Sequence, residues 1–273
     1  PSIKPTLATM TRKYGANQAM AIREEGYKSL DWIDNFINRE KIDCHFKKCG
    51  RFQAAHTPAH FDALVRDTQK LGEEEGVEFK IVPRDDQRKE LGTDSYFGGV
   101  TLTNHASLDP AKYYVGLLRK AKLAGAEVTG NCPAQDIQKD GGVYIITTPK
   151  GEIRAKNIII ATNGYTTNLV PWVQHRVIPI GTYMIATEPL PKALMDNLFP
   201  NDRVVSDTCK VIYYYRPSPD RSRVLFGGRV SADETNPAIS GPILKRDMCR
   251  IFPELTNYNY THSWTGTVAF TFD

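Results

Sequence analysis

The spacing of apolar residues at the start of the chain predicts helices. Over residues 4–42, apolar positions recur mostly at three- and four-residue steps with charges between them, as in an amphipathic helix packed on a larger body. Thr57 and Pro58 are a typical N-cap and N1 pair, and they predict a second helix that runs to about Glu75. Residues 44–56, between the two helices, are predicted to form an extended, hairpin-like segment.

The middle of the chain predicts a β-α-β unit. Ser107 or Asp109 is expected to cap a helix that Pro110 opens and Gly125 ends. A short strand is expected at residues 126–129, and the apolar segment NIIIAT predicts a buried strand further on. Two alternating segments between them, VYIITT and GEIRA, predict a small antiparallel meander inserted into the unit.

The second half of the chain predicts longer strands. From Val177 onward, aromatic and β-branched residues are concentrated in long segments, which predict the strands of a second domain. Because side chains alternate along a strand, Tyr214 is expected to point opposite to Tyr213 and Tyr215. A last helix is expected at about residues 242–251. Together these elements predict a mixed α/β (α+β) fold.

The composition argues against polyanions and membranes as partners. Of the 273 residues, 41% are hydrophobic and 24% are charged, and the formal charge is only +4 with both signs interspersed. We therefore expect no nucleic-acid partner. No apolar run reaches the roughly 18–20 residues that a membrane span needs, so no membrane partner is expected either.

The cysteines indicate a reducing compartment. The five cysteines form no C-x-x-C pair and are widely spaced, which favours reduced thiols and predicts a cytoplasmic protein. The N-terminus lacks the residue order of a signal peptide. Because the chain does not begin with Met, we expect it to be a piece of a longer protein. The oligomeric state is left open.

The segment IIIATNGYT contains a candidate binding site. In an open α/β sheet, ligands bind outside the carboxyl ends of the strands. A strand that ends in Ala161, Thr162, Asn163 and Gly164 leaves its backbone open to a flat or phosphorylated cofactor. On spacing alone, an ordinary β-turn around Asn-Gly explains these residues as well.

Several segments in order resemble a known family. They are GGVTLTNHASLDPAKYYVGLLRKAKLAGAEV, GEIRAKNIIIATNGYTTNLVPW, RVIPIGTYMIATEPL, RVLFGGRV and SWTGTVAFTFD. Together they resemble the FAD-dependent D-amino-acid oxidase superfamily, especially its γ-glutamylputrescine oxidoreductase-like members, and they cover most of the chain. The resemblance implies an FAD/NAD(P)-binding-type domain, incomplete in this chain, with a mixed-sheet substrate domain.

The resemblance also implies how the domains divide the chain. The implied segments are a helical segment packed on the FAD domain (1–42), the substrate domain (43–106 and 166–259), the FAD-binding domain (107–165) and a return to the FAD domain (260–273).

The same resemblance implies which residues lie near FAD and the substrate. The backbone at Pro133 and Ala134 is expected beside the adenine end of FAD, and the turn at 161–164 is expected to pass by the cofactor. Tyr183 and Met184 are expected in the substrate pocket near the isoalloxazine.

A carboxylate-bearing substrate would need an arginine able to form two hydrogen bonds. Arg216, after the three tyrosines, and Arg229, after a glycine pair, are the candidates, although a solvated arginine at a strand end explains each as well. No side chain is marked as catalytic. That fits hydride transfer to flavin from a neutral amine, which needs no strong base.

We therefore expect an FAD-dependent oxidoreductase that oxidises a primary or secondary amine, in a polyamine conjugate or an amino acid. The sequence departs from the family pattern because no G-x-G-x-x-G, the turn that holds the cofactor's pyrophosphate, follows a strand. The alternative is a truncated, non-catalytic module that binds a small molecule without a cofactor.

Two other classes of chemistry are not indicated. His56 and His60 lie four residues apart but have no acidic or cysteine partner at a useful spacing, and no H-E-x-x-H is present. No G-x-S-x-G occurs either. We expect neither a metal site nor a serine hydrolase.

Overall fold

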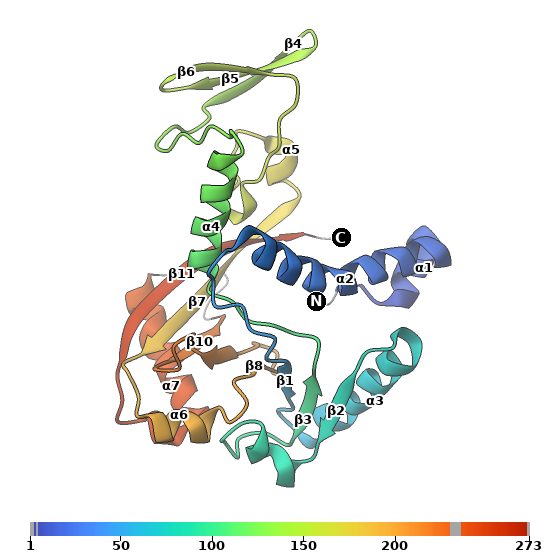
Figure 1. Cartoon of the computed structure of the whole chain (residues 1–273), viewed down its shortest axis with the longest axis vertical. Helices are drawn as coiled ribbons and strands as arrows, with labels where there is room; N and C mark the ends of the chain where they lie inside the picture. Colours follow the sequence, from blue (N-terminus) through green and yellow to red (C-terminus); the bar gives the residue numbers. More distant parts are fainter. Residues whose placement is uncertain (1–2, 4, 230–235, 272–273) are drawn as a thin grey trace.

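A long mixed sheet forms the body of the molecule (Figure 1). The computed structural model describes residues 3, 5–229 and 236–271, and its larger sheet has eight strands in the order β11-β7-β10-β9-β8-β1-β3-β2. Only the β1–β8 pair is parallel among these described strands. The strands are β1 (Arg51–Ala54), β2 (Phe79–Val82), β3 (Gly99–Leu102), β7 (Val177–Thr187), β8 (Val204–Asp207), β9 (Tyr214–Pro217), β10 (Val224–Gly228) and β11 (Tyr260–Thr271).

Helices flank this sheet and a smaller lobe extends from it (Figure 1). The helices are α1 (Leu7–Tyr14), α2 (Ala16–Glu40), α3 (Pro58–Glu75), α4 (Pro110–Leu123), α5 (Pro171–Gln174), α6 (Lys192–Leu198) and α7 (Pro237–Ile251), with 3-10 turns η1 (Arg84–Lys89), η2 (Asn163–Tyr165) and η3 (Pro253–Leu255). The smaller lobe carries a three-stranded sheet of β4 (Asp136–Asp140), β5 (Val143–Thr148) and β6 (Gly151–Ala155).

The N-terminal helical segment is broken at one glycine. The sequence predicts a single helical segment over residues 4–42, whereas the structure has two helices, α1 and α2, on either side of Gly15. Gly15 has a φ of 82°, a conformation that residues with a side chain rarely adopt. The glycine therefore lets the chain change direction between the two helices.

One face of the large sheet carries the hydrophobic core. Phe52, Val205, Tyr215 and Phe226 lie on neighbouring strands and are at most 3% exposed. They pack under apolar residues of α6 and α7, such as Met248. Because side chains alternate along each strand, the residues between them point to the other face of the sheet.

Helix α2 contacts both α3, beside the large sheet, and α4, which leads into the smaller lobe. Near its start, Arg23 Nε donates a hydrogen bond to Glu75 Oε2 of α3 at 2.8 Å, and the Tyr27 hydroxyl also donates to the Glu75 carboxylate. Near its end, Ile37 packs in a cluster that includes Leu117 of α4. The helix thus fixes α3 and α4 relative to each other.

The predicted β-α-β unit in the smaller lobe does not form. Residues 126–129 and 157–162 contain no strand, and Ile159 is 91% exposed. In the described part of the chain, β4, β5 and β6 pair only with one another, so these segments have no strand beside them to complete a sheet. The central helix and the meander are present as predicted.

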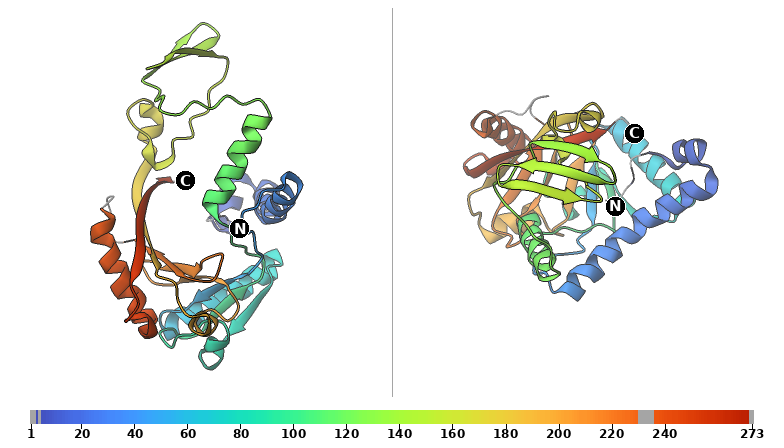
Figure 2. Two further views of the ribbon diagram at one scale, coloured as in Figure 1. Left: turned by 60° about the vertical axis from the view of Figure 1, so that its left-hand side comes forward. Right: turned by 90° about the horizontal axis from the view of Figure 1, so that it is seen from above.

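Other boundaries also differ from the prediction. Residues 44–56 form no hairpin, because β1 pairs with β3 and β8. The last helix begins at Pro237, earlier than predicted, with Asn236 as its N-cap. Residues 260–271, which the resemblance implies to lead back to the FAD domain, form β11, which pairs with β7 over its full length and extends with it toward the smaller lobe (Figure 2).

Helices α3 and α4 begin where their capping residues predict. Thr57 Oγ1 accepts the His60 N–H at 3.1 Å at the start of α3. Asp109 Oδ1 accepts the N–H groups of Ala111 and Lys112 at 3.0 Å at the start of α4. These caps satisfy backbone donors that have no partner inside the helix.

We predict that the contact between α2 and α3 contributes measurably to stability. Glu75→Gln removes the negative charge beside the buried Arg23 and should lower the free energy of unfolding by about 3 kcal/mol in urea titrations. Tyr27→Phe is the matched control, because it removes one hydrogen bond and leaves the ion pair, and it should cost about 1 kcal/mol. Equal losses in the two variants would contradict the ion-pair explanation.

Candidate functional site

The face of the large sheet opposite the core carries a row of residues, of which Ser206 and Gly227 are buried and the others are at least partly exposed. Directly paired residues on neighbouring strands share a face, so the strand pairings place these residues side by side. We call this row the open face; it consists of Gln53, Ser206, Tyr214, Gly227, Met184 and Trp264, on β1, β8, β9, β10, β7 and β11. None of these residues is acidic.

Two side chains of the open face converge over a glycine. A Cβ atom on Gly227 would lie 2.1 Å from Met184 Sδ and 2.4 Å from Tyr214 Cε2. The absence of a side chain at Gly227 therefore lets Met184 and Tyr214 lie flat over the middle of the sheet. Burial raises the pKa of Tyr214, which keeps its hydroxyl protonated. The result is an apolar and aromatic platform.

Two arginines stand next to this row on the same side of the sheet. Arg216 donates a hydrogen bond to the Leu108 carbonyl at 2.8 Å, and Arg51 donates to the Ser206 hydroxyl at 3.0 Å. Burial lowers the pKa of both guanidinium groups. Neither forms an ion pair with a carboxylate in the described part of the chain. The open face therefore has a positive potential.

The structure separates the residues predicted to bind substrate. Met184 and Arg216 lie on the open side of the sheet, as does Tyr214, which points away from Tyr213 and Tyr215 as predicted. Tyr183 is 0% exposed and lies in the hydrophobic core, because alternation turns it to the opposite face from Met184. Its predicted place in the pocket is therefore not supported.

The remaining predicted arginine lies directly past the end of β10. Arg229 follows the last residue of β10 and is exposed. It belongs to no strand, so the sheet does not hold it in the row with Met184.

The turn at residues 161–164 packs against the edge of the large sheet. Asn163 Oδ1 accepts the Ala269 N–H at 2.9 Å, and the Tyr165 hydroxyl accepts the Thr267 N–H at 3.1 Å. A Cβ on Gly164 would lie 2.6 Å from the backbone carbonyl of Thr267. Gly164 is therefore needed for contact with β11, rather than to leave space for a ligand as the sequence suggested.

The other residues predicted near FAD lie on exposed backbone. Pro133 and Ala134 belong to the irregular segment between α4 and β4, and Ala161 and Thr162 are exposed as well. Within the described residues, the N–H groups of residues 157–164 donate no hydrogen bond. Free backbone donors fit a nucleotide that lies against them, although no glycine-rich phosphate turn accompanies them.

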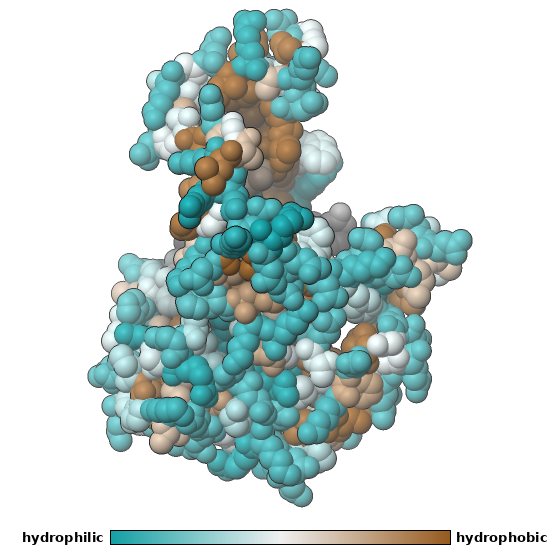
Figure 3. Space-filling model, viewed as in Figure 1, coloured by the Kyte–Doolittle hydropathy of each residue, from teal (hydrophilic) through white to brown (hydrophobic). Residues whose placement is uncertain are grey.

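Apolar residues of the smaller lobe are exposed around these segments (Figure 3). Leu123 is 73% exposed and Trp172 is 66% exposed, on either side of the meander in the sequence. Segments with free backbone N–H groups and exposed apolar residues have the properties of an interaction surface.

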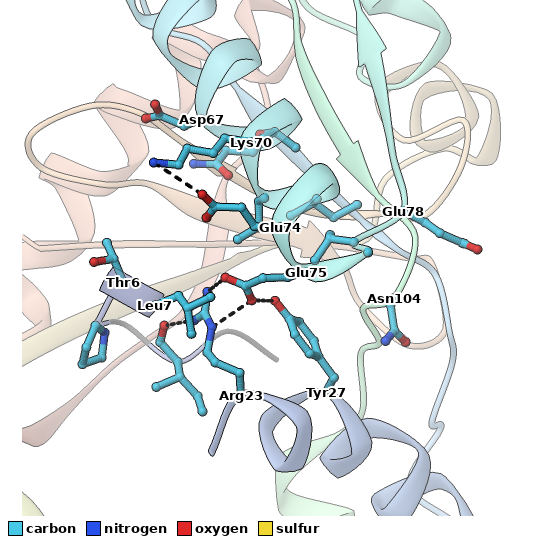
Figure 4. Close-up of a pocket in the computed structure, with 18 of the residues that line it drawn as sticks. Thr6, Leu7, Arg23, Tyr27, Asp67, Lys70, Glu74, Glu75, Glu78 and Asn104 are labelled. Carbon is cyan, nitrogen blue, oxygen red and sulfur yellow. Dashed lines mark hydrogen bonds and ion pairs between the residues drawn. The ribbon is translucent and has the colours of Figure 1, made fainter. Parts of the chain in front are cut away.

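A cavity of about 1500 Å³ meets the open face at its β1 end. Helices α1, α2 and α3 contribute to its walls, and Figure 4 shows Arg23, Tyr27 and Glu75 turned toward one another within it. Arg51, Gln53 and His105 also line this cavity. Burial is the largest cause that lowers the pKa of His105 from 6.5 to about 4, and nearby positive charge adds to it, with Arg51 as a smaller contributor.

The sequence analysis missed these last three residues. The alternation R-F-Q-A in β1 signals a strand with one polar side, which points to Arg51 and Gln53. No local pattern links them to His105, which reaches them through the Gly50 N–H donating to the His105 carbonyl at 2.9 Å.

No metal site was expected. His60 Nδ1 lies 2.9 Å from the Thr208 hydroxyl, and no metal-binding group of three His, Cys, Asp or Glu residues occurs among the described residues. Also within that part of the chain, no helix combines the length and apolar character needed to cross a membrane.

The fold resembles those of solved structures. Glycine oxidase from Geobacillus kaustophilus has a similar structure, with a TM-score of 0.72 and 18% identity over 94% of this chain and 67% of that chain. Residues 7–273 match the model of the family described as FAD dependent oxidoreductase. The chain therefore belongs to this family, which confirms the predicted resemblance and the mixed α/β fold.

Two curated relatives are more similar to it in sequence. It is 36% identical to a probable oxidoreductase, OrdL, from Rhizobium meliloti (strain 1021), over 94% of this chain and 59% of that protein. It is 26% identical to gamma-glutamylputrescine oxidoreductase from Escherichia coli (strain K12), over 95% of this chain and 61% of that protein. The chain thus spans about three fifths of the length of these relatives.

We predict that His105 makes stability depend on pH. Its pKa is 6.5 when unfolded and about 4 when folded, so between these values only the unfolded chain takes up the proton. The free energy of unfolding should therefore fall as the pH drops through this range and lose nothing more to this residue below about 4. Denaturant titrations of the chain and of His105→Asn check this, because the difference between the two should vary only in that range.

We also predict that Asn163 holds the turn on β11. Asn163→Gly keeps the left-handed φ of 49° accessible and removes the side-chain hydrogen bond, so it should cost about 1 kcal/mol. Asn163→Ala adds backbone strain and should cost about 2 kcal/mol. Hydrogen exchange at the Ala269 N–H should be faster in both variants, and unchanged exchange would contradict the contact.

Proposed function

We propose that the protein containing this chain is an FAD-dependent oxidoreductase that oxidises a primary or secondary amine, in a polyamine conjugate or an amino acid. Family membership supports the reaction class, and the relative named gamma-glutamylputrescine oxidoreductase supports an amine as substrate. The observation that carries the proposal is the open face, where Met184 and Tyr214 form a platform beside the partly buried charge of Arg216.

The proposed roles of the chain's residues are to hold the amine and to set its protonation. When bound, FAD accepts a hydride from the carbon next to the amine nitrogen. The amine must be neutral for this, because the nitrogen lone pair stabilises the positive charge left on that carbon. Arg216 disfavours a second positive charge near it, so it lowers the pKa of a bound ammonium group. The row itself contains no acid, and the charge of Asp109 opposes only part of this effect, so no strong base is needed.

The residues proposed to adjoin FAD are the exposed segments of the smaller lobe. Pro133, Ala134 and the turn at 161–164 keep the positions proposed from the family resemblance, and the free backbone donors of residues 157–164 support them. Met184 is proposed to contact the substrate, and Arg229 stays a weaker candidate because it is outside the sheet. The chain has no G-x-G-x-x-G, so these residues account for only part of an FAD site.

The proposal predicts a pH-dependent reaction that Arg216 controls. In the FAD-loaded protein without oxygen, an amine substrate should bleach the flavin absorption, and the rate should rise with pH as the amine loses its proton. Arg216→Gln should move this rise to higher pH by about one unit, because one charge fewer disfavours the ammonium form. Stopped-flow measurement of bleaching against pH tests both points.

Arg246→Gln is the matched control, since it makes the same charge change on α7, which covers the opposite face of the sheet. Its pH profile should match that of the unaltered protein. If no primary or secondary amine bleaches the bound flavin, the proposed function is wrong. If bleaching occurs but the Arg216→Gln profile does not move, the reaction stands and the role given to Arg216 falls.

A further inference from the structure

We propose that Arg51, Gln53 and His105 form a binding site for the carboxylate group of a small molecule. The three side chains line the same cavity, at the β1 end of the open face. Arg51 and Gln53 lie two residues apart on β1 and therefore point to the same side of the sheet. The hydrogen bond from the Gly50 N–H to the His105 carbonyl brings the third residue beside them.

Arg51 has hydrogen-bond donors to spare. A guanidinium group has five N–H donors in a planar fork. In Arg51, only Nε and Nη2 are engaged in the described part of the chain, and both donate to the single hydroxyl of Ser206. A partly buried cation whose only described partner is a neutral hydroxyl is a strong site for an anion, and its fork matches the two oxygens of a carboxylate.

The other two residues supply neutral polar groups next to this charge. His105 Nδ1 is buried and has no hydrogen-bond partner among the described residues. An orphaned buried nitrogen is costly, so a polar ligand that satisfies it would bind more tightly. The Gln53 amide likewise makes no side-chain hydrogen bond in the described structure, and it can donate to the same ligand.

Most other charged side chains of the cavity wall are in ion pairs, whereas Glu78 has only a neutral hydroxyl as partner among the described residues. Arg23 is paired with Glu75, and Lys70 lies 3.6 Å from Glu74 (Figure 4). The Thr103 hydroxyl donates to Glu78 at 3.3 Å. Apolar walls adjoin these pairs, formed by residues such as Leu64, Leu71, Val77 and Leu102. The cavity therefore suits a ligand with an aliphatic part and a carboxylate that points to Arg51.

The carboxylate has two possible sources. One is the substrate, since the cavity and the platform share the open face at Gln53; this assignment rests on the proposed function. The other is a separate carboxylate ligand that binds beside the reaction site. Binding itself is expected in either case, and it requires neither FAD nor turnover.

Glutarate is the probe, and calorimetric titration of the chain without FAD measures its binding. We expect saturable binding that Arg51→Gln weakens at least about tenfold, because a charged hydrogen bond contributes about 1.5–3 kcal/mol. Arg51→Lys should bind with intermediate affinity, since it keeps the charge and loses the fork. Gln53→Glu, nearly identical in shape, should weaken binding by a similar factor through repulsion of the carboxylate.

Two controls separate this site from general attraction of anions to the cavity. Arg12→Gln makes the same charge change on α1, also in the cavity wall, and should change the dissociation constant less than about twofold. The dication of 1,4-diaminobutane should not compete with glutarate. Thermal melts establish that each variant is folded before it is titrated.

The outcomes are distinct. Absence of glutarate binding to the chain, or folded Arg51→Gln and Gln53→Glu variants that bind glutarate as tightly as the unaltered chain, overturns the site. In the FAD-loaded protein, glutarate that raises KM for an amine without changing kcat identifies the substrate as the source of the carboxylate. Glutarate that binds without changing either constant identifies a separate ligand. Failure of amines to bleach the flavin would count against the proposed function and leave the binding result intact.

Discussion

The alternation of side chains across the large sheet is the constraint on which the rest of the structure depends. Each strand sends one residue into the core beneath α6 and α7 and the next to the opposite side. A shift of one residue in any strand would exchange Phe226 for Gly227, or Tyr183 for Met184, and would destroy the core and the platform together. Stability and the candidate site therefore depend on the same register. The polar open face is specified by the core behind it.

Helix α2 adds the second constraint, because it fixes what stands in front of that face. Its ends contact different bodies: Arg23 holds α3 through Glu75, and Ile37 packs in the cluster that includes α4. The first contact closes one wall of the cavity, and the second sets the start of α4, where the Leu108 carbonyl accepts a hydrogen bond from Arg216. A series of contacts thus connects the Arg23–Glu75 ion pair between α2 and α3 to the guanidinium group of Arg216 on the sheet. Each link in it is an ordinary packing or hydrogen-bond contact.

Local chemistry made part of this fold predictable. The caps of α3 and α4, the meander and the opposite orientation of Tyr214 follow from residues close together in the sequence. The strand predicted at residues 157–162 did not form, because a strand needs a neighbour and sequence periodicity cannot supply one. The predicted place of Tyr183 in the pocket lacks support for a related reason: a strand pattern shows that Tyr183 and Met184 face opposite ways, but only the packed sheet shows which faces the core. The link between Arg51 and His105 joins distant segments and left no signal in the sequence.

The positive charges of Arg51 and Arg216 give the open face its proposed chemical roles. Burial makes a guanidinium costly unless an anion or a polar partner compensates it. Here Arg51 and Arg216 donate hydrogen bonds to a hydroxyl and a carbonyl, which are weak partners for a cation. The charge of Asp109 acts on Arg216, but the row beside the two arginines contains no acid. A fold that only needed stability would gain by placing a carboxylate or an apolar residue there. The same weakly compensated charge favours a neutral amine over an ammonium ion and a carboxylate over water. One electrostatic feature thus supports both the proposed oxidation of an amine and the proposed carboxylate site.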